Sequence, residues 1–216
     1  MSFGGAKKLI NRAGTTLMQK AGQTDRTTDP EFTDQERRYR LLEKTANQLQ
    51  KESKQYLDSI RGCTSAQVRL AETIDSFYQD NSDAAMAANS YRRAVGELEG
   101  KTARDLDAPF RATVLEPIGK MCSYWPEINK TIEKRNKKLL DYDAARTKVR
   151  KMTDKPSDSE SVKLPAAEKL SEDAREVFEV LNNQIMAEIP QLLDLRIPYL
   201  DPSFGRRSMH RQFIHS

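Results

Sequence analysis

Residues 39–77 read YRLLEKTANQLQKESKQYLDSIRGCTSAQVRLAETIDSF and decide the fold class. Side chains that are mostly apolar or small recur at alternating steps of three and four residues, at Tyr39, Leu42, Ala46, Leu49, Ser53, Tyr56, Ile60, Cys63, Gln67, Leu70, Ile74 and Phe77. A stripe sustained over about five heptads is typical of coiled-coil packing. A helix over residues 30–80 would be about 75 Å long. Because it cannot bury this stripe alone, we predict partner helices.

The start of this first helix is marked by Asp29, Pro30 and Glu31. An N-cap residue, a proline at the first helical position and an acid in the first turn together favour a helix start. Residues 81–90 are small and polar, and we interpret them as the turn that follows.

A second helix is predicted from this turn to about residue 152, with kinks or breaks at Pro109, Pro117 and Pro126. Its seam follows Ile118, Met121, Trp125, Ile128, Ile132, Arg135, Leu139, Tyr142 and Val149. Residues 153–165 are interpreted as a loop. A third helix begins near Pro165, crosses Pro190, and has its seam at Ala167, Leu170, Ala174, Val177, Leu181, Ile185, Ile189 and Leu192. No segment predicts a strand, so the expected fold is all-α, with three long kinked helices in an antiparallel coiled coil.

The first 24 residues form a basic arm without any acidic residue. Its apolar side chains fall mostly at helical spacing, at Phe3, Ala6, Leu9, Ile10, Ala13, Leu17 and Ala21. Four glycines weaken such a helix in water, by about 1 kcal/mol each. We therefore predict an amphipathic helix that stays disordered until a surface orders it, with Phe3, Leu9, Ile10 and Leu17 as membrane-inserting residues. The alternative is a flexible tail.

Composition agrees with long amphipathic helices, since 37% of the residues are hydrophobic and 31% are charged. Cys63 and Cys122 fit no metal or redox motif and suggest reduced thiols in the cytosol. There is no apolar run of about 18 residues, so we expect no membrane-spanning helix. We also expect no secretory signal, because the basic N-terminus lacks an apolar core of about 7–15 residues. N-myristoylation is not expected either, because Ser2 and not glycine follows Met1.

Positive charge is concentrated between Lys130 and Lys151, where nine Lys or Arg residues face only Glu133, Asp141 and Asp143. Clustered basic residues attract anionic headgroups, at about 1 kcal/mol per residue near the surface. The predicted lipid-binding set is Lys7, Lys8, Arg12, Lys20, Lys134, Arg135, Lys137, Lys138, Arg146, Lys148, Arg150 and Lys151. The alternative is a solvated helix face, and Arg135, which falls on the seam, could instead pair inside the bundle.

Four stretches carry a resemblance to a known family. They are MSFGGAKKLINRAG (1–14), ERRYRLLEK with LQKESKQYLDSIR (36–61), LDAPFRATVLEPIGK (106–120), and EKRNKKLLDYDAARTKVRKMTDKP (133–156) with the later LRIPYLDPSF (195–204). Together they resemble the N-BAR domains of amphiphysins, in particular the short fungal "reduced viability upon starvation" BAR proteins that lack an SH3 domain.

This resemblance implies a three-helix coiled coil that dimerises, binds anionic phospholipid through basic residues and gains curvature from its kinks. It implies a role in endocytosis and cortical actin organisation, in the cytoplasm at the plasma membrane and at cortical actin patches. The expected partner is a second copy or another BAR protein, especially an SH3-bearing one, with the actin machinery as an indirect partner.

The expected organisation is a basic arm at residues 1–24, a BAR domain at 25–204 with a truncated third helix, and a basic tail at 205–216 that departs from the family pattern. The competing hypothesis is a coiled-coil adaptor that binds proteins and not lipid. No catalytic constellation, metal site or cofactor motif is visible, so we predict no enzyme. Nucleic acid is not an expected partner, because no recognition motif accompanies the basic clusters.

Overall fold

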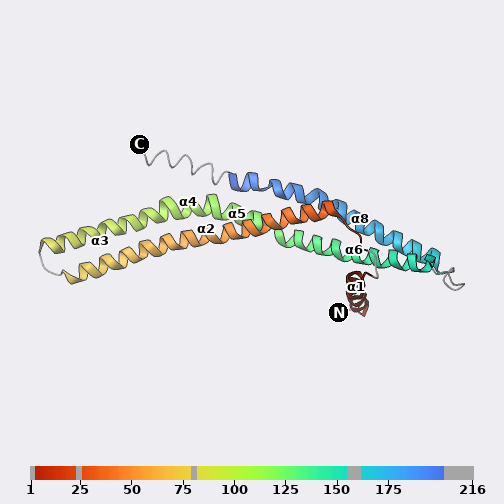
Figure 1. Ribbon diagram of the computed structural model, residues 1–216. Coiled ribbons are helices and arrows are strands. Elements are labelled where there is room, and N and C mark those ends of the chain that lie inside the picture. Colours follow the sequence, from red (N-terminus) through yellow and green to blue (C-terminus); the bar gives the residue numbers. More distant parts are fainter. Residues whose placement is uncertain (1–2, 23–25, 79–81, 155–161, 202–216) are drawn as a thin grey trace. The chain divides into compact units, whose positions relative to one another are not determined.

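The computed structural model describes residues 3–22, 26–78, 82–154 and 162–201, and for residues 3–9 it describes the backbone alone (Figure 1). In these ranges the chain is helical and contains no strand. The longer helices are α1 (Phe3–Lys20), α2 (Pro30–Phe77), α3 (Asp83–Thr102), α5 (Glu116–Cys122), α6 (Trp125–Asp154) and α8 (Leu164–Asp194). The predicted all-α fold of long, interrupted helices after an N-terminal helix is confirmed.

The contacts divide the chain into two compact units. The first unit comprises Met1–Arg40 and Tyr124–Leu193, and the second comprises Leu41–Ser123 and Asp194–Ser216. Helix α2 contributes its start to the first unit and the rest of its length to the second. Each unit is described by itself below.

Helix α2 begins where the sequence predicts. The carboxylate of Asp29 accepts a hydrogen bond from the backbone N–H of Phe32 at 2.9 Å, and Pro30 is the first helical residue. The side chain thus satisfies one of the N–H groups that a helix start leaves without a partner.

Helix α3 begins earlier than predicted. Ser82 is its N-cap and accepts a hydrogen bond from the backbone N–H of Ala85, so the helix starts at Asp83. The predicted turn over residues 81–90 was therefore too long. The residues after the cap include several alanines, which have the highest helix propensity and extend the helix over most of this stretch.

Two π-helical turns accommodate the prolines of the second predicted helix. They are η1 (Ala103–Asp107) and η2 (Arg111–Leu115), separated by the short helix α4 (Ala108–Phe110). The N–H of Ala108 donates to the carbonyl of Ala103 and that of Glu116 to the carbonyl of Arg111, directly before Pro109 and Pro117. Because proline lacks an N–H and its ring crowds the preceding turn, a widened turn is a common accommodation. The predicted irregularities at these prolines are confirmed.

The next break comes before Pro126. Helix α5 ends at Cys122, Ser123 and Tyr124 form a turn, and α6 starts at Trp125 with Pro126 as its second residue. Proline is well tolerated there, since the first N–H groups of a helix have no intrahelical partner. Pro126 therefore marks a helix start and does not kink a continuous helix.

The core of the first unit is built from the start of α2 and from α6 and α8, which lie side by side (Figure 1). Its most buried members are Phe32, Tyr39, Ile132, Ile185 and Ile189. The rings of Tyr39 and Trp125 meet edge to face at 5.9 Å, and those of Tyr142 and Phe178 stack at 6.2 Å.

The predicted seam of α8 is correct in part. Leu181, Ile185, Ile189 and Leu192 are buried as expected, but Leu170 and Val177 are exposed. Phe178 takes the buried place beside Val177, because its ring stacks on Tyr142 of α6.

The core of the second unit lies between α2 and the segment from α3 to α5, which run alongside each other (Figure 1). Leu57 packs there with Phe110, Val114 and Ile118. Two ion pairs join the same elements, Arg61 with Asp107 and Arg92 with Asp75. Apolar packing and ion pairs therefore hold the two sides of this hairpin together.

The predicted seam of α2 is correct at Tyr39, Ala46 and Ser53, which are buried, but beyond Ser53 the buried face moves off the heptad positions. Ser53, Leu57 and Ala71 are buried, whereas Tyr56, Cys63, Leu70 and Phe77 are exposed. The interval from Ser53 to Ala71 equals about five turns at 3.6 residues per turn. A straight helix departs from a strict heptad by about 20° per repeat, so its buried face moves off the heptad positions.

Replacing Leu57 with alanine should lower the free energy of unfolding by about 2–5 kcal/mol, because it leaves a cavity in the core of the second unit. Leu57 is 1% exposed, whereas Leu41 on the same helix is 66% exposed. The control Leu41→Ala should change stability by less than about 0.5 kcal/mol. Urea unfolding followed by circular dichroism measures both, and equal losses would contradict the assigned core.

Candidate membrane-binding surface

A basic stripe runs along α6. Lys134, Lys138 and Lys148 stand at steps that place them, together with Asp141, on one face of the helix. Lys134 and Lys148 are exposed and Lys138 is partly exposed. We call these three lysines the basic stripe; it can present positive charge to an anionic surface.

Other predicted residues flank this stripe. Lys137 is partly exposed and pairs with Glu133 at 2.5 Å, which lowers the pKa of that carboxyl below its usual range through their hydrogen bond. Lys151 and Lys20 are exposed. All three side chains have access to solvent.

Arg135 lies inside the first unit, so its prediction as a lipid-binding residue was wrong. Only 2% of it is exposed. Its guanidinium donates to Asp29 at 2.7 Å and to Asn182 at 2.8 Å. It also lies over the rings of Phe32, at 3.7 Å from the centroid, and Phe178, at 4.9 Å. Burial lowers the pKa of Arg135, and the ion pair with Asp29 opposes this shift.

Arg146 and Arg150 point to a different side of α6 from the basic stripe, as their positions along the helix require. With Arg26 they line a hollow of about 580 Å³. Arg146 also pairs with Asp143 at 3.5 Å. Arg26 was missed by the sequence analysis, because nothing in the linker before α2 indicates that it lies beside these two arginines.

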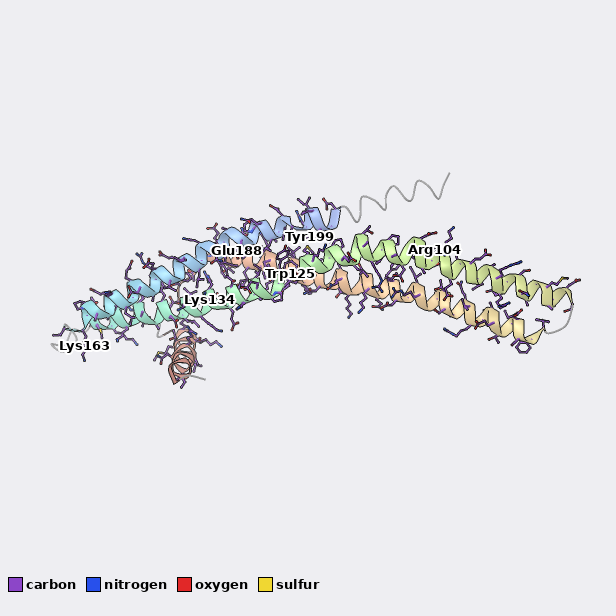
Figure 2. All side chains as sticks on the ribbon, turned by 180° about the vertical axis from the view of Figure 1, so that it is seen from behind. Arg104, Trp125, Lys134, Lys163, Glu188 and Tyr199 are labelled. Carbon is purple, nitrogen blue, oxygen red and sulfur yellow. The ribbon has the colours of Figure 1, made fainter. Side chains whose placement is uncertain are left out.

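Helix α1 packs on α6, on the side away from α8 (Figure 1). Arg12 donates to both carboxylate oxygens of Asp141, at 2.8 and 2.7 Å, and this hydrogen bonding raises the pKa of Arg12. In Figure 2, α1 lies beside the stretch of α6 that contains Lys134. The arm is helical as predicted. It was expected to stay disordered until a surface orders it, whereas in the structure α1 is docked on α6.

A second anchor lies near the C-terminal end of α1. The amide of Gln19 donates to Asp143 at 2.8 Å. The same carboxylate accepts from the hydroxyl of Thr27 at 2.5 Å and from its backbone N–H at 3.2 Å. Asp143 therefore joins α6 both to α1 and to the segment that leads into α2.

The predicted membrane-inserting residues fall into two groups. Ile10 is 71% exposed and Leu17 is 68% exposed on the docked helix. The side chains of Phe3, Lys7, Lys8 and Leu9 lie outside the described residues, so their roles stay predictions.

Within the described ranges, no helix combines the length and the apolar character needed to cross a bilayer. Over the same ranges, no group of three or more His, Cys, Asp and Glu side chains is arranged to hold a metal ion.

Comparison with protein families matches residues 6–208 to the family described as BAR domain. The chain belongs to the BAR domain family. This confirms the resemblance to amphiphysins and to the fungal "reduced viability upon starvation" proteins. BAR domains are scaffolds that dimerise and bind membranes, and the family is not one of enzymes.

Two fungal relatives and one solved structure illustrate the similarity. Protein hob3 of Schizosaccharomyces pombe is 53% identical over 204 residues, which cover 94% of this chain and 77% of that protein. The "Regulator of cytoskeleton and endocytosis RVS161" of Candida albicans is 43% identical over 208 residues, covering 94% and 78%. The amphiphysin BAR domain from Drosophila superposes with a TM-score of 0.67 at 29% identity, covering 88% of this chain and 87% of that one.

Replacing Arg135 with methionine should lower the free energy of unfolding by about 3 kcal/mol, since removing one partner of a buried ion pair leaves the other charge without compensation. The control Lys134→Met removes the same charge from the neighbouring, exposed position and should change stability by less than about 0.5 kcal/mol. Thermal or urea unfolding compares the two. If the two variants were equally stable, Arg135 would not have the interior role assigned to it.

Proposed function

We propose that this BAR domain binds anionic membrane surfaces through the basic stripe of α6 together with the outward side of α1, and that it thereby senses or induces curvature. The observation that carries the proposal is that α1 docks at Asp141, between Lys138 and Lys148 of the stripe. The lysines that would attract lipid headgroups and the apolar side chains of α1 that would enter the acyl boundary therefore lie beside each other in the first unit.

The two contributions are individually weak. Each lysine near an anionic surface contributes about 1 kcal/mol, and burying a leucine or isoleucine side chain contributes about 1.5–3 kcal/mol. A dimer carries two copies of the basic stripe and two copies of α1, which raises the effective affinity for the membrane. Exposed charges are screened beyond roughly 8–10 Å at ordinary ionic strength, so the electrostatic part should weaken as salt rises.

The exposed apolar residues of the second unit support a helical partner. Cys63, Leu70 and Phe77 follow one another at intervals of seven residues along α2 and are exposed. A stripe of this spacing suits another helix. We propose that the partner is a second copy or an SH3-bearing BAR protein.

We infer the cellular role from the similarity to fungal relatives. The Candida albicans relative is named a regulator of cytoskeleton and endocytosis. By this similarity we propose that the chain acts in endocytosis and cortical actin organisation, peripherally at the plasma membrane. The second candidate is a coiled-coil adaptor without lipid contact, which the same exposed stripe on α2 favours.

Reversing the charge of the basic stripe, in the triple variant Lys134→Glu, Lys138→Glu and Lys148→Glu, should weaken binding to anionic vesicles. Losing three lysines at about 1 kcal/mol each amounts to about 3 kcal/mol, and the new carboxylates add repulsion, so the affinity should fall at least roughly a hundredfold. Co-sedimentation at low and high salt measures it. The control reverses Lys44, Lys51 and Lys54, three exposed lysines of the second unit. Equal losses in both triple variants would mean that net charge, and not the stripe, governs binding.

Replacing Leu17 with glutamine should weaken vesicle binding about tenfold, because an exposed side chain that enters the acyl boundary loses its apolar transfer energy. Leu41→Gln is the matched control, since Leu41 is similarly exposed but lies in the second unit. Neither change should affect stability. Unaltered binding of the Leu17 variant would exclude insertion by this side of α1.

A further inference from the structure

Helix α1 is attached to its own protein by its polar side. Arg12 and Gln19 hold carboxylates of α6, Thr15 is buried, and Thr16 is partly buried. Ile10, Ala13 and Leu17, at steps of three and four residues, are exposed on the opposite side. An amphipathic helix on a globular protein normally buries its apolar side and exposes the polar one. Here the arrangement is reversed.

The docking contacts supply order that the arm lacks by itself. An isolated helix of this length with glycine at position 14 is marginal in water. Arg12 and Asp141 form a bidentate pair, which fixes orientation as well as distance. Asp143 is almost completely buried and anchors Gln19, the residue before the helix ends at Lys20.

Asp141 also stands out by its charge. It lies on the same face of α6 as Lys134, Lys138 and Lys148. A carboxylate at this position repels the anionic surface that the lysines attract, so headgroup binding does not explain why Asp141 is acidic. The contact of Asp141 with Arg12 of α1 does explain it.

We propose that Asp141 and Asp143 are positioning residues, which hold α1 folded on α6 with Ile10 and Leu17 facing outward, so that the inserting helix is oriented before it meets lipid. This inference rests on the proposed membrane-binding function. A helix ordered in advance does not have to lose its conformational freedom on binding, which improves affinity without any new contact. The arm and α6 then approach the bilayer as one body.

The test compares two variants that each remove one negative charge from α6. Asp141→Asn weakens the bidentate contact with α1, whereas Glu133→Gln affects a side chain paired with Lys137 of the same helix. The first readout is amide hydrogen exchange of residues 12–20 in the protein without vesicles. We expect protection to fall about tenfold in Asp141→Asn, the effect of losing a hydrogen bond between charged groups, and to stay unchanged in Glu133→Gln.

The second readout is binding to vesicles that contain anionic phospholipid. If charge alone mattered, both variants would bind more tightly, since each removes a repelling carboxylate. We expect Glu133→Gln to follow this rule and Asp141→Asn to bind more weakly than the unaltered protein. Exchanging the partners, in the double variant Arg12→Asp with Asp141→Arg, should restore both protection and binding relative to either single change.

The outcomes separate this inference from the proposed function. If the unaltered protein binds vesicles but Asp141→Asn keeps its protection or binds as tightly as Glu133→Gln, the positioning role is overturned while membrane binding stands. If the unaltered protein does not bind anionic vesicles, the proposed function fails. The exchange measurement then still decides whether Asp141 holds α1 on α6.

Discussion

The buried guanidinium of Arg135 joins the three helices that make up the core of the first unit. It reaches Asp29 at the start of α2, projects from α6, and bonds to Asn182 of α8, with the rings of Phe32 and Phe178 beside it. A buried ion pair is weak evidence for net stability, because desolvation offsets its attraction. Its value here is geometric. With Arg135 turned inward, the basic stripe lies on a different face of α6, where Lys134 and Lys148 are exposed and Lys138 is partly exposed.

The rotation of α6 about its axis therefore links packing to function. One side of the helix carries Ile128, Ile132 and Arg135 into the core, and the other carries the basic stripe and the docking site for α1. A single helix thus serves as structural core and as candidate lipid surface. The hollow beside Arg26, Arg146 and Arg150 places further positive charge on a different side of the same helix.

In the second unit, apolar packing holds α2 against a segment whose helices are interrupted at two prolines. Its α2 segment pairs with a chain that contains two prolines, and the π-helical turns η1 and η2 precede them. The packing of Leu57 against Phe110, Val114 and Ile118 covers only one side of α2. Cys63, Leu70 and Phe77 are exposed on another side of α2, in agreement with a family whose members dimerise.

Caps, prolines and periodic apolar residues are local signals, and they were enough to predict the helical class, the start of α2 at Pro30 and the irregularities before Pro109 and Pro117. Four longer stretches of sequence were enough to predict the family. The sequence also indicated a basic region between residues 130 and 151, since charge is visible in composition. The folded structure was needed to show that Arg135 is interior, that Arg26 lies beside Arg146 and Arg150, and that α1 docks through Asp141 and Asp143. Each of these depends on which residues far apart in the chain come together. Burial of a charged side chain depends on the neighbours that compensate it, and one-dimensional spacing does not contain that information.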